Sequence, residues 1–311
     1  ARARGRRPRH AAAALADVRG RLDDRKWLDR AKGVLAQTRG MGEAEAFVLL
    51  RKLAMHSNQR LGDVSRALTE AAAWAEALNR AGQLRMLSQR LVKLAVQRLL
   101  DVDAARARHL ETEALRRGHT LLEGLADLPR RAPVGASLAD ELARVQAAWR
   151  VFEGSLVPRP TPASLQLADA RASDLLDAAE ALVAALEAAS NRRPLRAVNL
   201  CGRQRMLAQR LAKAALLADL PGGAHHAAEL PVALDAFEAA LRELEDTPLS
   251  TGEIRESLAA ARNEWSRLLA GARSAGTADG RLALSRASES LLDAFDELTS
   301  LYERSLQVLM S

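Results

Sequence analysis

The chain contains one stretch of sequence twice, and this repeat limits its possible folds more than any other feature. Residues 79–95 read NRAGQLRMLSQRLVKLA and residues 199–215 read NLCGRQRMLAQRLAKAA, at an offset of 120 residues. We call them the first box and the second box. Such a repeat indicates a duplicated structural unit, so the two halves should fold alike. Ten of the seventeen positions are identical, which in the first box are Asn79, Gly82, Arg85, Met86, Leu87, Gln89, Arg90, Leu91, Lys93 and Ala95.

The composition favours helices over strands. Aromatic residues make up only 3% of the chain, whereas strands prefer aromatic and β-branched residues. Apolar residues make up 48%, which is enough for a core, but no apolar run approaches the ~20 residues needed to span a bilayer. The single cysteine, Cys201, excludes an internal disulfide framework. We therefore expect an all-α protein that is cytoplasmic and has no membrane partner.

The net charge of +7 is unevenly distributed. Residues 1–70 hold 16 Lys and Arg against 8 Asp and Glu, whereas the remainder holds 30 against 31. A basic N-terminal quarter predicts a polyanionic partner, nucleic acid before an anionic membrane. Residues 1–10, expected to form a disordered basic tail, account for only part of this excess. The chain begins without a methionine, so its native start is left open.

Apolar spacing and the positions of proline and glycine predict the helices and their grouping. The eight helices expected after residue 70 have short connections, which predicts two four-helix bundles with long helices. Trp149 and Trp265 lie 116 residues apart, which supports duplication of a whole domain. We expect domains at residues 11–70, 71–157 and 158–311. The predicted helices cover residues 11–39, 43–57, 60–102, 104–128, 138–156, 164–190, 195–220, 224–245, 253–271 and 282–310.

Residues 18–70 resemble the ANTAR family, the RNA-binding module of transcription antitermination regulators. The resemblance is carried by RAKGVL at residues 30–35, EAF at 45–47, LR at 50–51, AM at 54–55, NQRL at 58–61 and DV at 63–64. It implies a small three-helix unit that binds paired stem-loops in leader RNA and prevents a terminator from forming.

Cationic side chains in this segment are the candidate RNA ligands, because they can pair with phosphates and stack on loop bases. Trp27 could also stack on a base, but a lone Trp at helical spacing is more often a core residue. The alternative for each cation is an ordinary place on a solvated helix face. The candidates are Arg25, Lys26, Arg30, Lys32, Arg51, Lys52 and Arg60.

The boxes carry cations within an apolar helical pattern. Neither box contains an acidic residue, so Arg85 and its counterpart Arg205 need an acceptor from another helix, a partner chain or a bound anion. The guanidinium fork suits a small planar oxyanion. Alternatively, carboxylates of neighbouring helices pair with both arginines and fix the bundle register. We favour anion binding, with both arginines free of a carboxylate. The candidate ligands are Arg85, Arg205, Gln89, Gln209, Arg90 and Arg210.

The boxes are also similar to the N-terminal sensor domain of type IV pili methyl-accepting chemotaxis transducers (PilJ-like) and to NIT nitrate- and nitrite-sensing domains. This resemblance rests on GQLRMLSQRLVK at residues 82–93 and GRQRMLAQRLAK at residues 202–213. It implies nitrate or nitrite as the effector and Arg85 and Arg205 as its ligands. Gln83-Leu84 departs from the more typical Arg203-Gln204, so the first site is expected to be the weaker one.

No pattern in the sequence indicates an enzyme. There is no phosphate-binding glycine loop, no nucleophile elbow and no metal-ligand spacing. His225 and His226 are adjacent, and adjacent side chains point apart on a helix, so we expect no metal site there. We expect no catalytic residue and no cofactor.

The sequence therefore predicts a nitrate- or nitrite-responsive RNA-binding transcription antiterminator, in which the sensor controls the ANTAR unit, acting as a homo-oligomer. The alternative is a protein-interaction or dimerisation regulator with an RNA-binding ANTAR domain and no small-molecule ligand. The target transcript, the choice between nitrate and nitrite, and the number of boxes that bind an anion stay open.

Overall fold

The computed structural model describes residues 7–131, 136–190, 195–247 and 251–309. The all-α prediction is confirmed, because these residues form helices and connecting turns and contain no strand. The chain divides into two compact units: Ala1–Ala73 with Leu306–Ser311, and Trp74–Ser305. Helix α3 (Leu61–Leu99) contributes residues to both units.

The first unit contains α1 (Arg7–Arg39), α2 (Glu43–His56) and the beginning of α3. Its core brings together Ala31 and Leu35 of α1, Ala46 and Leu50 of α2, and Leu68 of α3. The predicted disordered tail lies outside the described residues over 1–6, whereas residues 7–10 belong to α1.

Two local features set the turn between α1 and α2. Gly40 has a φ of +62°, a conformation that glycine adopts without steric cost. At the start of α2, the Glu45 carboxylate accepts a hydrogen bond of 3.1 Å from the backbone N–H of Gly42. This negative charge also lies where the helix dipole favours it.

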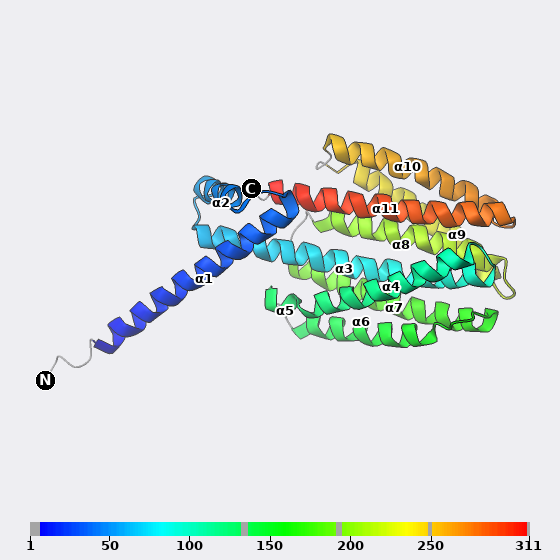
Figure 1. The fold of residues 1–311 in the computed structure, drawn as a ribbon, viewed down its shortest axis with the longest axis horizontal. Helices are drawn as coiled ribbons and strands as arrows, with labels where there is room; N and C mark the ends of the chain where they lie inside the picture. The colour runs from blue at the N-terminus through cyan, green and yellow to red at the C-terminus, as the bar shows by residue number, and fades with distance from the viewer. Residues whose placement is uncertain (1–6, 132–135, 191–194, 248–250, 310–311) are drawn as a thin grey trace. The chain divides into compact units, whose positions relative to one another are not determined.

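The second unit contains the rest of α3, helices α4 to α10 and α11 as far as Ser305, with the repeated boxes on α3 and α8 (Figure 1). Helix α6 packs against α7, and α8 packs against α9. Among the described residues, no helix combines the length and apolar content that a membrane span requires. The later helices are α4 (Ala104–Ala126), α5 (Leu128–Arg131), α6 (Ala136–Ser155), α7 (Pro162–Ser190), α8 (Leu195–Ala218), α9 (Ala224–Glu245), α10 (Gly252–Arg273) and α11 (Ala278–Leu309).

The two boxes lie on the most buried helices of this unit. Every residue from 81 to 97 is buried, and between 200 and 217 only Arg203 and Arg210 are not. A helix that is buried on all sides must pair its own polar side chains internally, because water does not reach them. The buried cations Arg85, Lys93, Arg205 and Lys213 are accordingly paired with carboxylates of other helices.

The tryptophans confirm that flanking helices pack in a related way in both halves. Trp149 of α6 and Trp265 of α10 are both buried. The Trp149 ring lies against Gly118 of α4, where a Cβ atom would overlap it at 2.0 Å. Trp265 stacks on Phe237 of α9 with ring centroids 3.8 Å apart. Each tryptophan thus connects one pair of outer helices.

Helix starts follow the expected capping chemistry. Before α7, the Thr161 hydroxyl accepts from the Ser164 N–H at 3.1 Å, and the Ser164 hydroxyl accepts from the Thr161 N–H at 2.8 Å. At α10, the Thr251 hydroxyl accepts from the Ile254 N–H. Ser250, which precedes this cap, lies outside the described residues.

Candidate functional site

Helices α3 and α8 approach closely where two repeated glycines meet. A Cβ atom built on Gly82 would lie 3.5 Å from the Cα of Gly202, and one built on Gly202 would lie 3.5 Å from the Cα of Gly82. A methyl group on either glycine would make ordinary contact with the facing backbone but would crowd Arg85 Nη2, which would lie 3.3 Å from a Cβ on Gly82 and 3.1 Å from one on Gly202. The identity of these glycines in the two boxes therefore has a packing reason.

The guanidinium groups of Arg85 and Arg205 both lie at this crossing. One terminal nitrogen of each is within 4 Å of the Cβ position that either glycine would have. Both side chains are almost completely buried, with at most 2% of either exposed. The structure therefore brings the arginines of the two boxes to one place, rather than to two separate sites.

The two arginines have mirrored partners. Arg85 Nη2 donates to Asn199 Oδ1 at 2.7 Å, and Arg205 Nη2 donates to Asn79 Oδ1 at 2.8 Å. Each Nη1 donates to a carboxylate: Arg85 to Glu180 of α7 at 2.9 Å, and Arg205 to Asp296 of α11. Each box thus supplies the asparagine that holds the other box's arginine.

The expectation that these arginines lack a carboxylate partner is wrong. Glu180 and Asp296 pair with them from helices that the sequence cannot place beside the boxes, at separations of 95 and 91 residues. The acceptor came from another helix, one of the three sources left open. A buried guanidinium without any acceptor would be too costly, and the fold supplies one for each.

Each guanidinium nevertheless keeps one unused donor. The Nε atoms of Arg85 and Arg205 are buried and have no hydrogen-bond partner among the described residues. Burial lowers the pKa of Arg85; Glu180 opposes this shift, and the like charge of Arg205 adds to it. An unpaired buried N–H is unfavourable. Two such donors at one crossing are suited to a small acceptor-rich ligand.

The other predicted ligands have different surroundings. Gln89 donates to the Ser88 hydroxyl and Gln209 donates to the Ser288 carbonyl, and neither amide oxygen has a partner among the residues that the structure describes. Arg90 pairs with Glu289, whereas Arg210 pairs with Glu229. Within the described part of the chain, neither of these two arginines hydrogen-bonds a group that holds Arg85 or Arg205.

Sequence reasoning did not assign a role to Asn79, Asn199, Glu180 or Asp296. Identity between the boxes was the available signal for the two asparagines, since both recur at the 120-residue offset. The two carboxylates are 116 residues apart, the same offset as the two tryptophans, but a Glu and an Asp are not identical. Only the fold shows that they are counterparts.

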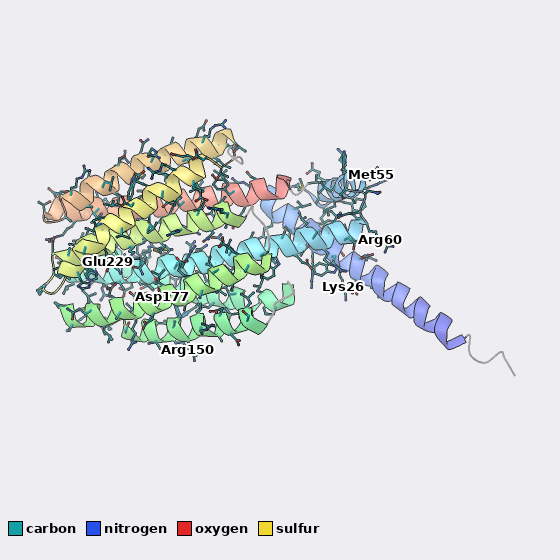
Figure 2. All side chains as sticks on the ribbon, turned by 180° about the vertical axis from the view of Figure 1, so that it is seen from behind. Lys26, Met55, Arg60, Arg150, Asp177 and Glu229 are labelled. Atoms are coloured by element: carbon teal, nitrogen blue, oxygen red, sulfur yellow. The ribbon has the colours of Figure 1, made fainter. Side chains whose placement is uncertain are left out.

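The candidate RNA ligands lie in the first unit and are mostly exposed. Lys26 on α1 and Arg60 just before α3 are labelled in Figure 2. Lys32 differs, because its ammonium pairs with Asp29 at 2.8 Å and Glu43 at 3.4 Å and is only 19% exposed. It is therefore the least accessible of the seven cations. The exposed ones are Arg25, Lys26, Arg30, Arg51, Lys52 and Arg60.

Trp27 was expected to be a core residue, but it is half-buried. Two guanidinium groups lie over its ring, Arg30 at 5.2 Å and Arg66 at 5.5 Å from the centroid. Arg66 of α3 was not among the predicted RNA ligands. Together these residues form a cationic aromatic cluster at the surface of the unit.

Comparisons with known proteins match both parts of the chain. The ANTAR domain model matches residues 16–68, and the model described as the type IV pili methyl-accepting chemotaxis transducer N-term matches residues 66–182 and 186–291. The nitrate regulatory protein of Klebsiella oxytoca is 44% identical over 61 residues, a stretch that covers 19% of this chain and 15% of that protein. No solved structure gives a significant match.

The matched ranges also bear on where the repeats divide. They meet between residues 182 and 186, near the end of α7, whereas the sequence analysis placed the division at 157/158, next to the prolines before α7. A division after α7 gives each half four long helices. The transducer match covers more than half of the chain, so the chain belongs to that family and carries an ANTAR domain at its N-terminal end.

Proposed function

We propose that this protein is a nitrate- or nitrite-responsive, RNA-binding transcription antiterminator of the cytoplasm, a regulator rather than an enzyme. The observation that carries the proposal is the crossing of α3 and α8, where two guanidinium groups from two repeats converge with unused Nε donors. The ANTAR match supports the RNA-binding role. The relative named for nitrate regulation supports the choice of anion.

The anion competes with the carboxylates at the crossing. Nitrate presents three coplanar oxygens, which match the planar fork of a guanidinium. Glu180 and Asp296 are 43% and 28% exposed, so each can turn to water when it leaves its arginine. One bound anion then accepts from Arg85 and Arg205 together, which makes a single site shared by both repeats.

Release of Glu180 and Asp296 from the arginines starts the conformational change. Glu180 belongs to α7 and Asp296 to α11, so anion binding loosens both helices from the central pair α3 and α8. Helix α3 is uninterrupted from Leu61 to Leu99 and carries residues of both units. A rotation or shift of α3 at the crossing therefore reaches the residues that complete the ANTAR core.

The RNA-binding role rests on the exposed cations of the first unit. Arg51→Ala should weaken binding to a two-hairpin leader RNA about tenfold, because a phosphate contact or stacking plane is lost. Lys32→Ala should have a smaller effect, since Asp29 and Glu43 already neutralise that ammonium. Filter binding at fixed salt measures both. Equal affinities for wild type and Arg51→Ala would contradict this choice of surface.

A second candidate function is favoured by the ion pairs themselves. Glu180 and Asp296 neutralise both arginines, so the arginines could serve only to fix the register of an interaction or dimerisation bundle. In that case Arg85→Gln and Arg205→Gln would lower stability without changing any response to nitrate.

The two functions are separated by leader-RNA binding measured with and without nitrate. In the proposed function, wild type responds to nitrate, whereas folded Arg85→Gln and Arg205→Gln proteins bind RNA but do not respond. The matched control is Arg203→Gln, which changes an exposed arginine of the second box and should keep the response. A response that survives in both crossing variants would overturn the proposal.

A further inference from the structure

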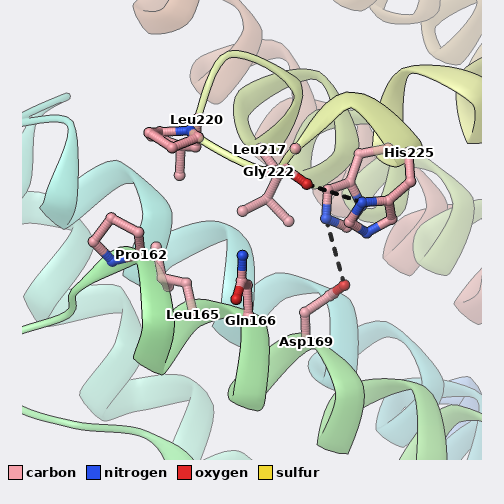
Figure 3. A pocket seen from close by; sticks show the side chains of 11 residues that line it. Pro162, Leu165, Gln166, Asp169, Leu217, Leu220, Gly222 and His225 are labelled. Carbon is pink, nitrogen blue, oxygen red and sulfur yellow. Dashed lines mark hydrogen bonds and ion pairs between the residues drawn. The ribbon is translucent and has the colours of Figure 1, made fainter.

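Two histidines at the start of α9 lie beside an aspartate of α7 (Figure 3). His225 and His226 follow the turn at residues 221–223, and Asp169 faces them from α7. Their potential ligand atoms all lie within 4.8 Å of one another. None of these residues takes part in the arginine crossing.

The expectation that the two histidines diverge is wrong. Their rings are 3.8 Å apart between centroids with an interplanar angle of 40°. Both lie in the first turn of α9, and His225 is three residues after Gly222, whose φ of +81° favours glycine. The exposed His225 ring can therefore lean over the buried His226 ring.

The hydrogen bonds leave one coordinating atom free on each residue. His225 Nδ1 lies 3.1 Å from the Gly222 carbonyl, so this nitrogen carries the proton and Nε2 keeps its lone pair. Asp169 uses Oδ1 for Lys213, and its Oδ2 lies 3.8 Å from His226 Nε2, beyond hydrogen-bond distance. A ligand histidine anchored by a carbonyl and a ligand carboxylate anchored by a cation are usual in metal sites.

His226 is the least explained residue of the group. It is buried, its Nδ1 atom has no hydrogen-bond partner in the described part of the chain, and the nearest carboxylate oxygen of Glu229 is 3.6 Å away. A buried imidazole nitrogen without a hydrogen-bond partner is available as a metal ligand.

We propose that Asp169, His225 and His226 bind one divalent transition-metal ion, for which Zn²⁺ is the best match. Two imidazole nitrogens and one carboxylate oxygen are typical zinc ligands, whereas Mg²⁺ and Ca²⁺ prefer oxygen alone. Bonds of ~2 Å in a tetrahedral site require the ligand atoms to close to roughly 3.3 Å, which small side-chain rotations provide. A cavity of about 20 Å³ beside them has room for a water as the fourth ligand.

Metal binding there would join the two repeats. Asp169 belongs to α7, whereas the histidines follow the turn that connects α8 to α9. The ion would therefore tie α7 to the second repeat, and it would hold the carboxylate that also neutralises Lys213 of the second box. We expect a gain in stability that depends on free metal concentration.

The test uses the full chain without a histidine tag, freed of metal by chelation. Wild type should bind one equivalent of Co²⁺ with the visible absorption of a tetrahedral site, and Zn²⁺ should displace it and raise Tm by several degrees. His225→Ala changes an exposed residue and should fold normally, but it should bind at least tenfold more weakly and lose the Tm shift. His109→Ala, which removes an exposed histidine of α4 paired only with Glu113, is the matched control.

Two results would overturn the proposal. One is wild type that binds no Co²⁺ or Zn²⁺ at micromolar concentrations. The other is His225→Ala protein with unchanged affinity and unchanged Tm shift. Nitrate is absent from both titrations, so these outcomes are independent of the arginine crossing.

Discussion

The two copies of the repeated box agree at their arginines and differ at their other cations. Arg85 and Arg205 have the same kinds of partner in mirrored positions. At the later cations of the boxes the symmetry ends. In the first box Arg90 and Lys93 share Glu289, whereas in the second box Lys213 pairs with Asp169. The symmetric part is the candidate site, and the asymmetric part ties the bundle together.

The largest expected loss of stability comes from removing the carboxylate that Arg90 and Lys93 share in the first box. Lys93 is completely buried, and Glu289 is the counter-ion of both Lys93 and Arg90. Glu289→Gln should lower the free energy of unfolding by roughly 3–5 kcal/mol, because it leaves buried cations uncompensated. Urea denaturation followed by circular dichroism measures this loss.

The second box supplies the matched comparison. Arg210 and Glu229 are about one-third exposed, so Glu229→Gln should cost only about 0–1 kcal/mol. Similar losses of stability in Glu289→Gln and Glu229→Gln would contradict this difference between the boxes.

The next largest loss of stability is expected from a substitution of a glycine at the crossing. In Gly202→Ala the added methyl group would lie 3.1 Å from Arg85 Nη2, so the guanidinium must move. We expect a loss of about 1–3 kcal/mol from overpacking, together with loss of anion binding. Gly154→Ala, where nothing lies within 4 Å of the added methyl group, should leave both stability and anion binding intact. If Gly202→Ala protein bound the anion with wild-type affinity, the anion site would have to lie away from the crossing.

The smallest effect is a dependence of stability on pH, with opposite signs for two carboxylates of α11. Burial raises the pKa of Glu303 to about 7 from 4.5, so the native state holds this proton longer than the unfolded state. The contribution of Glu303 to the free energy of unfolding is present below pH 4.5 and is lost as pH rises through 7. For Glu289, burial opposes the shift, but Lys93 and Arg90 outweigh it and lower the pKa to about 2. The contribution of Glu289 to the free energy of unfolding is present above pH 4.5 and is lost as pH falls through about 2.

Unfolding between pH 5 and pH 8 isolates the Glu303 effect. Wild type should lose on the order of 1–2 kcal/mol across this range, and Glu303→Gln should flatten the curve. Glu187→Gln, at the counterpart position that bonds Asn199, is the control. A slope that is unchanged in Glu303→Gln would contradict the assignment.

The sequence predicts the helices of this molecule well, because proline, glycine and capping residues mark their ends. Helix α9 begins and ends where predicted, and α7 begins at the Thr161-Pro162 pair within two residues of the prediction. The boxes were identified as the candidate site from their repetition, from their cations in an apolar pattern and from their resemblance to a sensor family. These features are local or repeated, so a single sequence displays them.

What the sequence could not show depends on contacts between distant segments. The pairing of Arg85 with Glu180 and the approach of Arg66 to Trp27 join residues of different helices. The convergence of His225 and His226 occurs in the first turn of α9, where the ring orientations depart from the pattern of an ideal helix. In each case the ideal periodicity of one helix gives no information about the partner.

The most direct test is a calorimetric titration of anion-free protein with nitrate, nitrite, chloride and sulfate. The account predicts one nitrate or nitrite per chain, with chloride and sulfate binding far more weakly. Arg85→Gln and Arg205→Gln should each abolish this binding completely, since both guanidinium groups hold the same ion, and Arg203→Gln should retain it. Two ions per chain, loss of only half the sites in either variant, or no nitrate-selective heat would contradict a single site shared by the two repeats.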